Sequence, residues 1–173
     1  APSPQTVSRV AQSLDAEVRR YHMRPLEDWY RYLILDGVYL KVKGASGVKR
    51  RLVLCAYGIT HEGKREMISF RQARAESETQ WEAFLQDLYR RGLEGKRLNL
   101  VVTDGNTGVH RALDTVYPYV PRQLCWAHKM RNVAARLPRK EQQACLEGAR
   151  AIYKADTRRE AGMRFRGGAQ QWR

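Results

Sequence analysis

The stretch RYLILDGVYLKVK at residues 31–43 decides the fold, because its β-branched, aromatic and leucine side chains predict a mostly buried strand. A turn with the sequence GASG, at residues 44–47, leads to a second expected strand at residues 48–59. The next turn, HEGK at residues 61–64, leads to a third strand at residues 65–73. Three strands joined by short turns predict an antiparallel meander.

The pattern after the meander changes to helices that alternate with strands. Ser77 is a suitable N-cap for a helix that continues to about Arg91. The remaining expected elements are helices at residues 4–20, 107–116, 125–137 and 139–160 and strands at 97–103 and 119–124, and residues 161–173 lose periodicity. Three antiparallel strands followed by crossover units with parallel strands predict an α/β fold with a mixed sheet flanked by helices, and this order matches the ribonuclease-H-like fold.

The charge of the chain indicates a polyanionic partner. Its 173 residues include 32 Lys and Arg against 18 Asp and Glu, a net charge of +14, which favours nucleic acid over an anionic membrane. The excess is concentrated toward the C-terminus, where residues 120–173 hold 13 basic and 4 acidic residues, a net charge of +9. We interpret this concentration as a phosphate-contacting surface, although the same charges also fit a solvated helical face.

Other features of the composition exclude several classes of protein. Apolar residues make up 43% of the chain, which is not a disordered composition. No apolar run approaches about 18 residues, and the N-terminal APSP lacks the pattern of a signal peptide, so we expect no membrane association. The absence of an initiator Met indicates a chain that begins inside a longer protein. Three widely spaced cysteines indicate a reducing compartment: Cys55, Cys125 and Cys145.

Two aspartates are the candidate catalytic and metal-binding residues. Asp36 lies in the middle of the apolar strand LILDGVYL, where a carboxylate is unfavourable unless it is paired or bound to metal. Asp104 ends the apolar run LNLVVTDG, at the edge of the sheet where ligand sites of α/β proteins lie, although Asp-Gly is also a common turn dipeptide. In the expected topology the two strands are adjacent and parallel, so the two carboxylates lie close together. They repel each other unless a divalent cation such as Mg²⁺ neutralises them.

Four blocks of sequence carry a resemblance to a known family. They are LDGVYLKVK at residues 35–43, ITHEGKREMISFRQARAESETQWEAFLQDLYRRGL at 59–93, LNLVVTDGNTGVHRAL at 98–113 and VYPYVPRQLCWAHKMRNV at 116–133. Over about residues 4–137 the chain resembles the Mutator-type bacterial insertion-sequence transposases, and the last block is the most specific. The resemblance implies a DNA transposase that cleaves transposon ends and transfers the strands to target DNA.

The resemblance also implies the components of the reaction. Asp36 and Asp104 correspond to the first two acids of a DDE triad, which holds two Mg²⁺ or Mn²⁺ ions when complete. The partners implied are double-stranded DNA, as transposon ends and as target, and further copies of the chain in a homodimer or larger assembly. The implied location is the bacterial cytoplasm, in association with the nucleoid.

The third acid of the triad is where this chain departs from the family pattern. In the family it is a Glu far downstream, beyond a helical insertion, whereas Glu141, Glu147 and Glu160 lie where that insertion should begin and are interpreted as helix-surface charges. We therefore expect a fragment that is inactive alone. Its expected parts are residues 1–24, the end of a helix-turn-helix-like DNA-binding segment and a linker; residues 25–137, a partial catalytic core; and residues 138–173, the start of an all-helical insertion.

The block CWAH supplies further candidates. By the resemblance, Cys125 and His128 match a Cys-x-x-His motif, for which we favour a structural role near the active site over half of a zinc site, because no second ligand pair has a suitable spacing. Trp126 is either a core residue or a platform on which a nucleobase stacks. The candidate DNA-binding residues are Arg122, Lys129, Arg131 and Arg136, of which Lys129 and Arg136 would share one face of a helix.

Two other functions remain open from the sequence. One is a DNA-binding module, a truncated or domesticated transposase that does not cut. The other is a ribonuclease-H-like nuclease without strand-transfer activity. A downstream Glu that faces the two aspartates separates the enzyme from the binding module, and strand-transfer products separate the transposase from the nuclease.

Overall fold

The computed structural model describes residues 3–44 and 47–171. The chain forms two compact units, residues 1–123 and residues 124–173, which we describe separately. The expected domain boundaries after residues 24 and 137 stay predictions.

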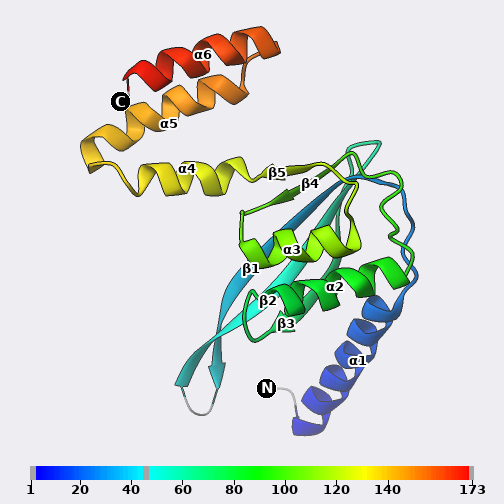
Figure 1. The fold of residues 1–173 in the computed structure, drawn as a ribbon. Helices are drawn as coiled ribbons and strands as arrows, with labels where there is room; N and C mark the ends of the chain where they lie inside the picture. Colours follow the sequence, from blue (N-terminus) through cyan, green and yellow to red (C-terminus); the bar gives the residue numbers. More distant parts are fainter. Residues whose placement is uncertain (1–2, 45–46, 172–173) are drawn as a thin grey trace. The chain divides into compact units, whose positions relative to one another are not determined.

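The first unit is built on a five-stranded mixed sheet with the strand order β3-β2-β1-β4-β5 (Figure 1). β1 pairs antiparallel with β2, and β2 pairs antiparallel with β3, which confirms the predicted meander. β4 pairs in parallel with the other side of β1, so the topology is the ribonuclease-H-like one expected from the sequence. The strands are β1 (Tyr30–Gly44), β2 (Gly47–Thr60), β3 (Arg65–Ala73), β4 (Leu100–Thr103) and β5 (Arg122–Leu124).

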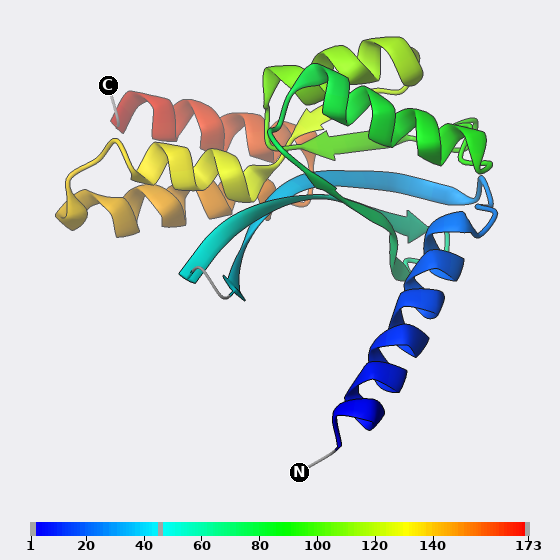
Figure 2. The same cartoon turned by 90° about the horizontal axis from the view of Figure 1, so that it is seen from below.

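Two helices cover one face of the sheet and bury the core. They are α2 (Glu78–Arg90) and α3 (Thr107–Val116), which lie side by side above the strands in Figure 2. The N-cap Ser77 accepts a hydrogen bond from the backbone N–H of Gln80, as the sequence predicts. The apolar face of α2 is fully buried against the sheet, and its members are Trp81, Phe84, Leu85 and Leu88.

The N-terminal helix α1 (Pro4–Met23) is attached to the first unit through its last turn. The Tyr21 ring stacks on Phe70 of β3, with ring centroids 5.8 Å apart. The guanidinium of Arg91, after the end of α2, donates hydrogen bonds to the carbonyls of Tyr21 and His22. These bonds satisfy carbonyl groups that a helix C-terminus otherwise leaves without a partner.

The second unit contains three helices, which differ in part from those expected. They are α4 (Trp126–Ala134), α5 (Arg139–Tyr153) and α6 (Arg158–Gln171). The continuous helix predicted at 139–160 is wrong, because Thr157 starts a new helix by accepting a hydrogen bond from the N–H of Glu160, while the Glu160 carboxylate accepts from the N–H of Asp156. Although residues 161–173 lose apolar periodicity in the sequence, α6 continues through Gly162, Gly167 and Gly168 to Gln171. In the described ranges no helix is both long and apolar enough to cross a bilayer.

Candidate active site

The register of β1 against β4 brings the two candidate aspartates to the same level of the sheet. The paired positions are Tyr32 with Leu100 and Ile34 with Val102, and the same offset matches Asp36 with Asp104. Neighbouring strands lie about 4.8 Å apart. Asp104 follows the last residue of β4, at the end from which the chain turns into α3.

A third carboxylate, that of Glu76, lies beside this pair. Glu76 follows β3 and precedes the N-cap of α2. It lies against Gly37, the residue after Asp36, because a Cβ atom placed on Gly37 would be 2.6 Å from Cδ and from Oε1 of Glu76. The glycine therefore leaves the space in which the Glu76 carboxylate lies.

Asn106 connects Glu76 to Asp104. Its backbone N–H donates to Oδ1 of Asp104 at 2.9 Å, and its side-chain Nδ2 donates to Oε2 of Glu76 at 3.4 Å. The remaining side-chain oxygen of Asn106 accepts from the N–H of Gly108 at 2.7 Å and so caps α3. One residue thus starts a helix and orients two carboxylates.

The electrostatics of the site show that the carboxylates act on one another. Burial raises the pKa of Glu76 above its usual range, and the negative charges of Asp104 and Asp36 raise it further. Burial also raises the pKa of the Cys55 thiol, the cross-strand neighbour of Asp36, and the Asp36 charge adds to that rise. Such mutual repulsion is relieved when a cation binds among the carboxylates.

The donor set fits a hard divalent ion. Carboxylate oxygens are the ligands that Mg²⁺ and Mn²⁺ take in proteins, and Mg²⁺ needs only one or two of them together with substrate phosphates. Across residues 3–44 and 47–171, no three His, Cys, Asp or Glu side chains are already arranged to hold a metal ion. The site is therefore a pair of aligned aspartates with a third carboxylate nearby, and the ligand shell would need substrate or water oxygens.

Glu76 is the site residue that sequence reasoning missed. The position of Glu76 after β3 could have identified it. β1 and β3 both run antiparallel to β2, so β3 runs in the same direction as β1 and as β4, which is parallel to β1. The ends of parallel strands meet at the same edge of a sheet, so a residue soon after β3 reaches the edge where Asp104 lies. From the sequence alone, this segment is interpreted only as the approach to the N-cap Ser77.

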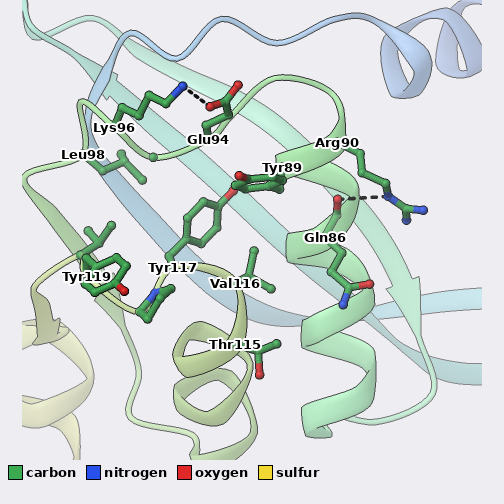
Figure 3. Close-up of a pocket in the computed structure, with 13 residues that line it drawn as sticks. Gln86, Tyr89, Arg90, Glu94, Lys96, Leu98, Thr115, Val116, Tyr117 and Tyr119 are labelled. Carbon is green, nitrogen blue, oxygen red and sulfur yellow. Dashed lines mark hydrogen bonds and ion pairs between the residues drawn. The ribbon is translucent and has the colours of Figure 1, made fainter.

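One hollow of the first unit lies away from these carboxylates. It has a volume of about 760 Å³ and is lined by the last turns of α2 and α3 and the loops that follow them. Figure 3 shows Tyr89 and Tyr117 at its centre, with the Glu94–Lys96 ion pair at its rim. Because the carboxylates precede the N-termini of the same two helices, the length of a helix, roughly 15–20 Å, separates the hollow from the site.

Arg122, a candidate DNA-binding residue, is held by α3 in the structure. Its guanidinium donates to Oδ1 of Asp114 at 2.7 Å and to the carbonyl of His110 at 3.1 Å. Its side chain is 21% exposed. These contacts assign Arg122 a role in fixing β5 against α3.

The other candidate DNA-binding residues lie in the second unit. Lys129 and Arg131 are exposed on α4. The helix ends at Ala134, so Arg136 lies in the turn that follows. The shared helical face predicted for Lys129 and Arg136 is therefore not formed, and the correction follows from a helix shorter than expected.

The Cys-x-x-His motif lies at the start of the same helix. Cys125 is the N-cap residue of α4, with its thiol free, and His128 is half-buried in the first turn. Trp126 is 37% exposed, and its ring packs at 54° against Tyr153 of α5. The two rings line a hollow of about 370 Å³ together with Arg131 and Arg150.

The three later glutamates all lie on helices of the second unit. Glu141 lies in the first turn of α5. Glu147 accepts a hydrogen bond from Gln143 at 2.6 Å, and Glu160 forms an ion pair with Arg164. The first of these contacts lies within α5 and the second within α6.

The fold and the site together define the class of this protein: a ribonuclease-H-like sheet with Asp36 within β1, Asp104 directly after β4 and Glu76 shortly after β3. Its family follows from comparison with known proteins: the model of the family described as "Transposase, Mutator family" matches residues 1–172. The chain belongs to the Mutator family of transposases. This finding confirms the resemblance inferred from the four sequence blocks.

Individual relatives agree with the family. The chain is 38% identical over 151 residues to the transposase for insertion sequence element ISRM5 of Rhizobium meliloti, covering 87% of this chain and 37% of that protein. It is 32% identical to the transposase for insertion sequence element IS905 of Lactococcus lactis, covering 89% of this chain and 39% of that protein. The chain thus spans less than half of the length of these relatives. A solved intasome of simian T-cell lymphotropic virus, in complex with PP2A regulatory subunit B56 gamma, aligns with a TM-score of 0.34 and 12% identity, over 70% of this chain and 48% of that chain.

Proposed function

We propose that this chain carries the first two acids of a DDE-type DNA transposase, which cleaves transposon ends and joins them to target DNA. The observation that supports this proposal most directly is the register of β1 and β4, whose offset matches Asp36 with Asp104. Membership of a family whose relatives are named as insertion-sequence transposases is consistent with it.

Asp36 and Asp104 would hold the divalent ions of the reaction. Two such ions, when bound, activate the attacking oxygen and stabilise the leaving one. Asp36 is fixed by its strand, because β1 is hydrogen-bonded to a strand on each side. Asp104 is oriented by the N–H of Asn106. Glu76, oriented by the side-chain amide of Asn106, would add a third carboxylate beside the ions.

Double-stranded DNA is the partner that the charge supports. The net +9 of residues 120–173 would bind phosphates and release counterions, so DNA affinity should fall steeply with salt. Assembly into a dimer or larger oligomer, and inactivity of these 173 residues alone, stay predictions from the family resemblance.

The test uses the whole transposase that contains this chain and a duplex with a transposon end. Asp104→Asn and Asp36→Asn should abolish cleavage and joining and leave DNA affinity within about threefold, because affinity comes mainly from Lys and Arg contacts to phosphate. Glu62→Gln, in the exposed turn between β2 and β3, makes the same change of charge outside the site and should keep wild-type activity.

Three results would count against the proposal. Wild-type cleavage by Asp104→Asn would remove the aspartate from the chemistry. DNA affinity that falls in step with activity would indicate a structural role. Cleavage without any joined product would favour a nuclease over a transposase.

A further inference from the structure

The hairpin of β1 and β2 extends well beyond the part of the sheet that the helices cover. Strand pairing continues from Tyr39 opposite Leu52 to Gly44 opposite Gly47. Residues 39–44 and 47–51, which we call the basic ribbon, are exposed along their whole length. Figure 1 shows this ribbon running out past α2 and α3.

The ribbon is strongly positive. Residues 39–51 have the sequence YLKVKGASGVKRR, which contains five Lys and Arg and no Asp or Glu. Lys41 lies directly opposite Arg50 across the two strands. Like charges at such positions destabilise a hairpin, and a bound anion would offset that repulsion.

Cations lie on both faces of the ribbon. Side chains alternate between faces along a strand, and directly paired residues share a face. Lys41, Lys43 and Arg50 therefore share one face, and the Arg50 guanidinium lies over the Tyr39 ring, 5.1 Å from its centre. The opposite face carries the other two cations, Lys49 and Arg51. A partner that contacts both faces at once must surround the ribbon with negative charge.

The dimensions match those of duplex DNA. The major groove of B-DNA is about 12 Å wide, admits a two-stranded ribbon and has a wall of phosphates on each side. At about 3.3 Å per residue, the six residues from Tyr39 to Gly44 cover roughly 20 Å. This length corresponds to about six base pairs at roughly 3.4 Å each.

We propose that the basic ribbon inserts into a groove of duplex DNA and binds the phosphates on both sides of it. The inference rests on the proposed function, because it takes the DNA at the ribbon to be the duplex that is cut at Asp36. The ribbon begins three residues after Asp36 on the same strand, roughly 10 Å away, and reaches to roughly 26 Å. A duplex that runs along the ribbon therefore meets it about three to eight base pairs from the phosphate held at the aspartates.

The ribbon also carries exposed apolar side chains, which a different partner, a second copy of the chain, would cover. Leu40, Val42 and Val48 are 46–60% exposed. A second copy of the chain could cover them by pairing with the ribbon. The clustering of five cations argues against this, since two copies would bring ten positive charges together.

The test compares two triple Gln variants of the 173-residue chain, one in the ribbon and one outside it, in salt titrations with a labelled duplex. Lys41→Gln/Lys43→Gln/Lys49→Gln removes three ribbon charges and should reduce the slope of log affinity against log salt by about 0.9 for each phosphate that is no longer neutralised, to a total of roughly 2.7. The same three positions changed to Arg should keep the wild-type slope, which shows that the ribbon accepts substitution.

The matched control removes three charges at the other end of the first unit. Arg90→Gln/Lys96→Gln/Arg97→Gln changes exposed residues at the end of α2 and in the loop that follows it. This variant should change the slope by less than about 1. Equal reductions of the slope in the two triple variants would overturn the inference, because net charge alone would then explain the binding.

Position and oligomeric state provide further readouts. In the whole transposase, hydroxyl-radical footprinting should show protection about three to eight base pairs from the cut site, and the ribbon variant should lose it. A ribbon variant that binds DNA like the wild type, or that loses only self-association in light scattering, would overturn the inference. The proposed function would still stand in either case if Asp104→Asn abolishes cleavage, so the two failures are distinguishable.

Discussion

Substituting Gly37 by Ala tests whether the position of the Glu76 carboxylate matters. The new Cβ atom would lie 2.6 Å from Cδ and Oε1 of Glu76, whereas carbon atoms in contact are about 3.5–4.0 Å apart. The carboxylate must therefore move by about 1 Å or more. Misplacement of a group by about 1 Å can reduce a rate by roughly 100-fold, so on the proposed function, with Glu76 beside the ions, the cleavage rate of the whole transposase should fall by about this factor.

The stability of the Gly37→Ala variant should change little. The residue does not have a positive φ, so Ala fits its backbone and stabilises the fold by about 0.4–1 kcal/mol through the unfolded chain. The displaced atoms are the end of a flexible side chain, which can turn aside. Urea unfolding should therefore give a midpoint at or slightly above that of the wild type, with cleavage reduced.

A double-mutant cycle with Glu76→Ala identifies the cause. Once the carboxylate is absent, Gly37→Ala has nothing to displace and should not reduce the rate further. Binding of Mn²⁺ to the 173-residue chain, followed by electron paramagnetic resonance, should show the same non-additivity. Wild-type cleavage by Gly37→Ala, or an equal loss of rate in the Glu76→Ala background, would refute the reasoning.

Two further predictions concern stability. Burial and the charges of Asp104 and Asp36 raise the pKa of Glu76 above its ordinary value of 4.5. The contribution of Glu76 to the free energy of unfolding is therefore full below pH 4.5 and is lost as pH rises through the raised pKa. Glu76→Gln should remove this pH dependence in metal-free urea titrations, and an unchanged pH profile in the variant would contradict the prediction. Gly92 has a φ of 119°, and a Cβ there would lie 2.2 Å from the carbonyl oxygen of Leu26, so Gly92→Ala should destabilise the chain by at least about 2 kcal/mol in thermal unfolding. A variant with wild-type stability would show that this turn can shift.

The order of the strands could be predicted from the sequence because local patterns determine it. Short turns join the first three strands, and the apolar run before Asp104 is buried as a strand should be. The break between α5 and α6 was harder to predict, since the sequence of α6 carries little apolar periodicity to mark the start of a new helix. Thr157 and Glu160 start α6 through side-chain hydrogen bonds that compete with a continuous helix, and only the folded backbone shows which arrangement forms.

The site could be predicted only in part. Asp36 and Asp104 were identifiable as candidates because a carboxylate is unusual within or directly after a strongly apolar strand, and their catalytic role stays a prediction. Glu76 lies in a polar connection where a Glu is ordinary, so its identification needed the space beside Gly37 and the hydrogen bond from Asn106. The partner of Arg122, Asp114, is eight residues away in sequence and becomes a neighbour only when β5 forms, whereas a contact of Arg122 with DNA stays a prediction.

The parallel pairing of β1 with β4 has a consequence for the order of folding. β1, β2 and β3 are joined by short turns, whereas β4 reaches β1 only after α2 and pairs with it at three positions. Contacts between distant segments form late, because closing the loop between them costs entropy first. The two aspartates therefore approach each other in a late step, against their own repulsion. A divalent ion bound between them would lower the barrier to docking β4, and chelation would release β4 before the meander opens.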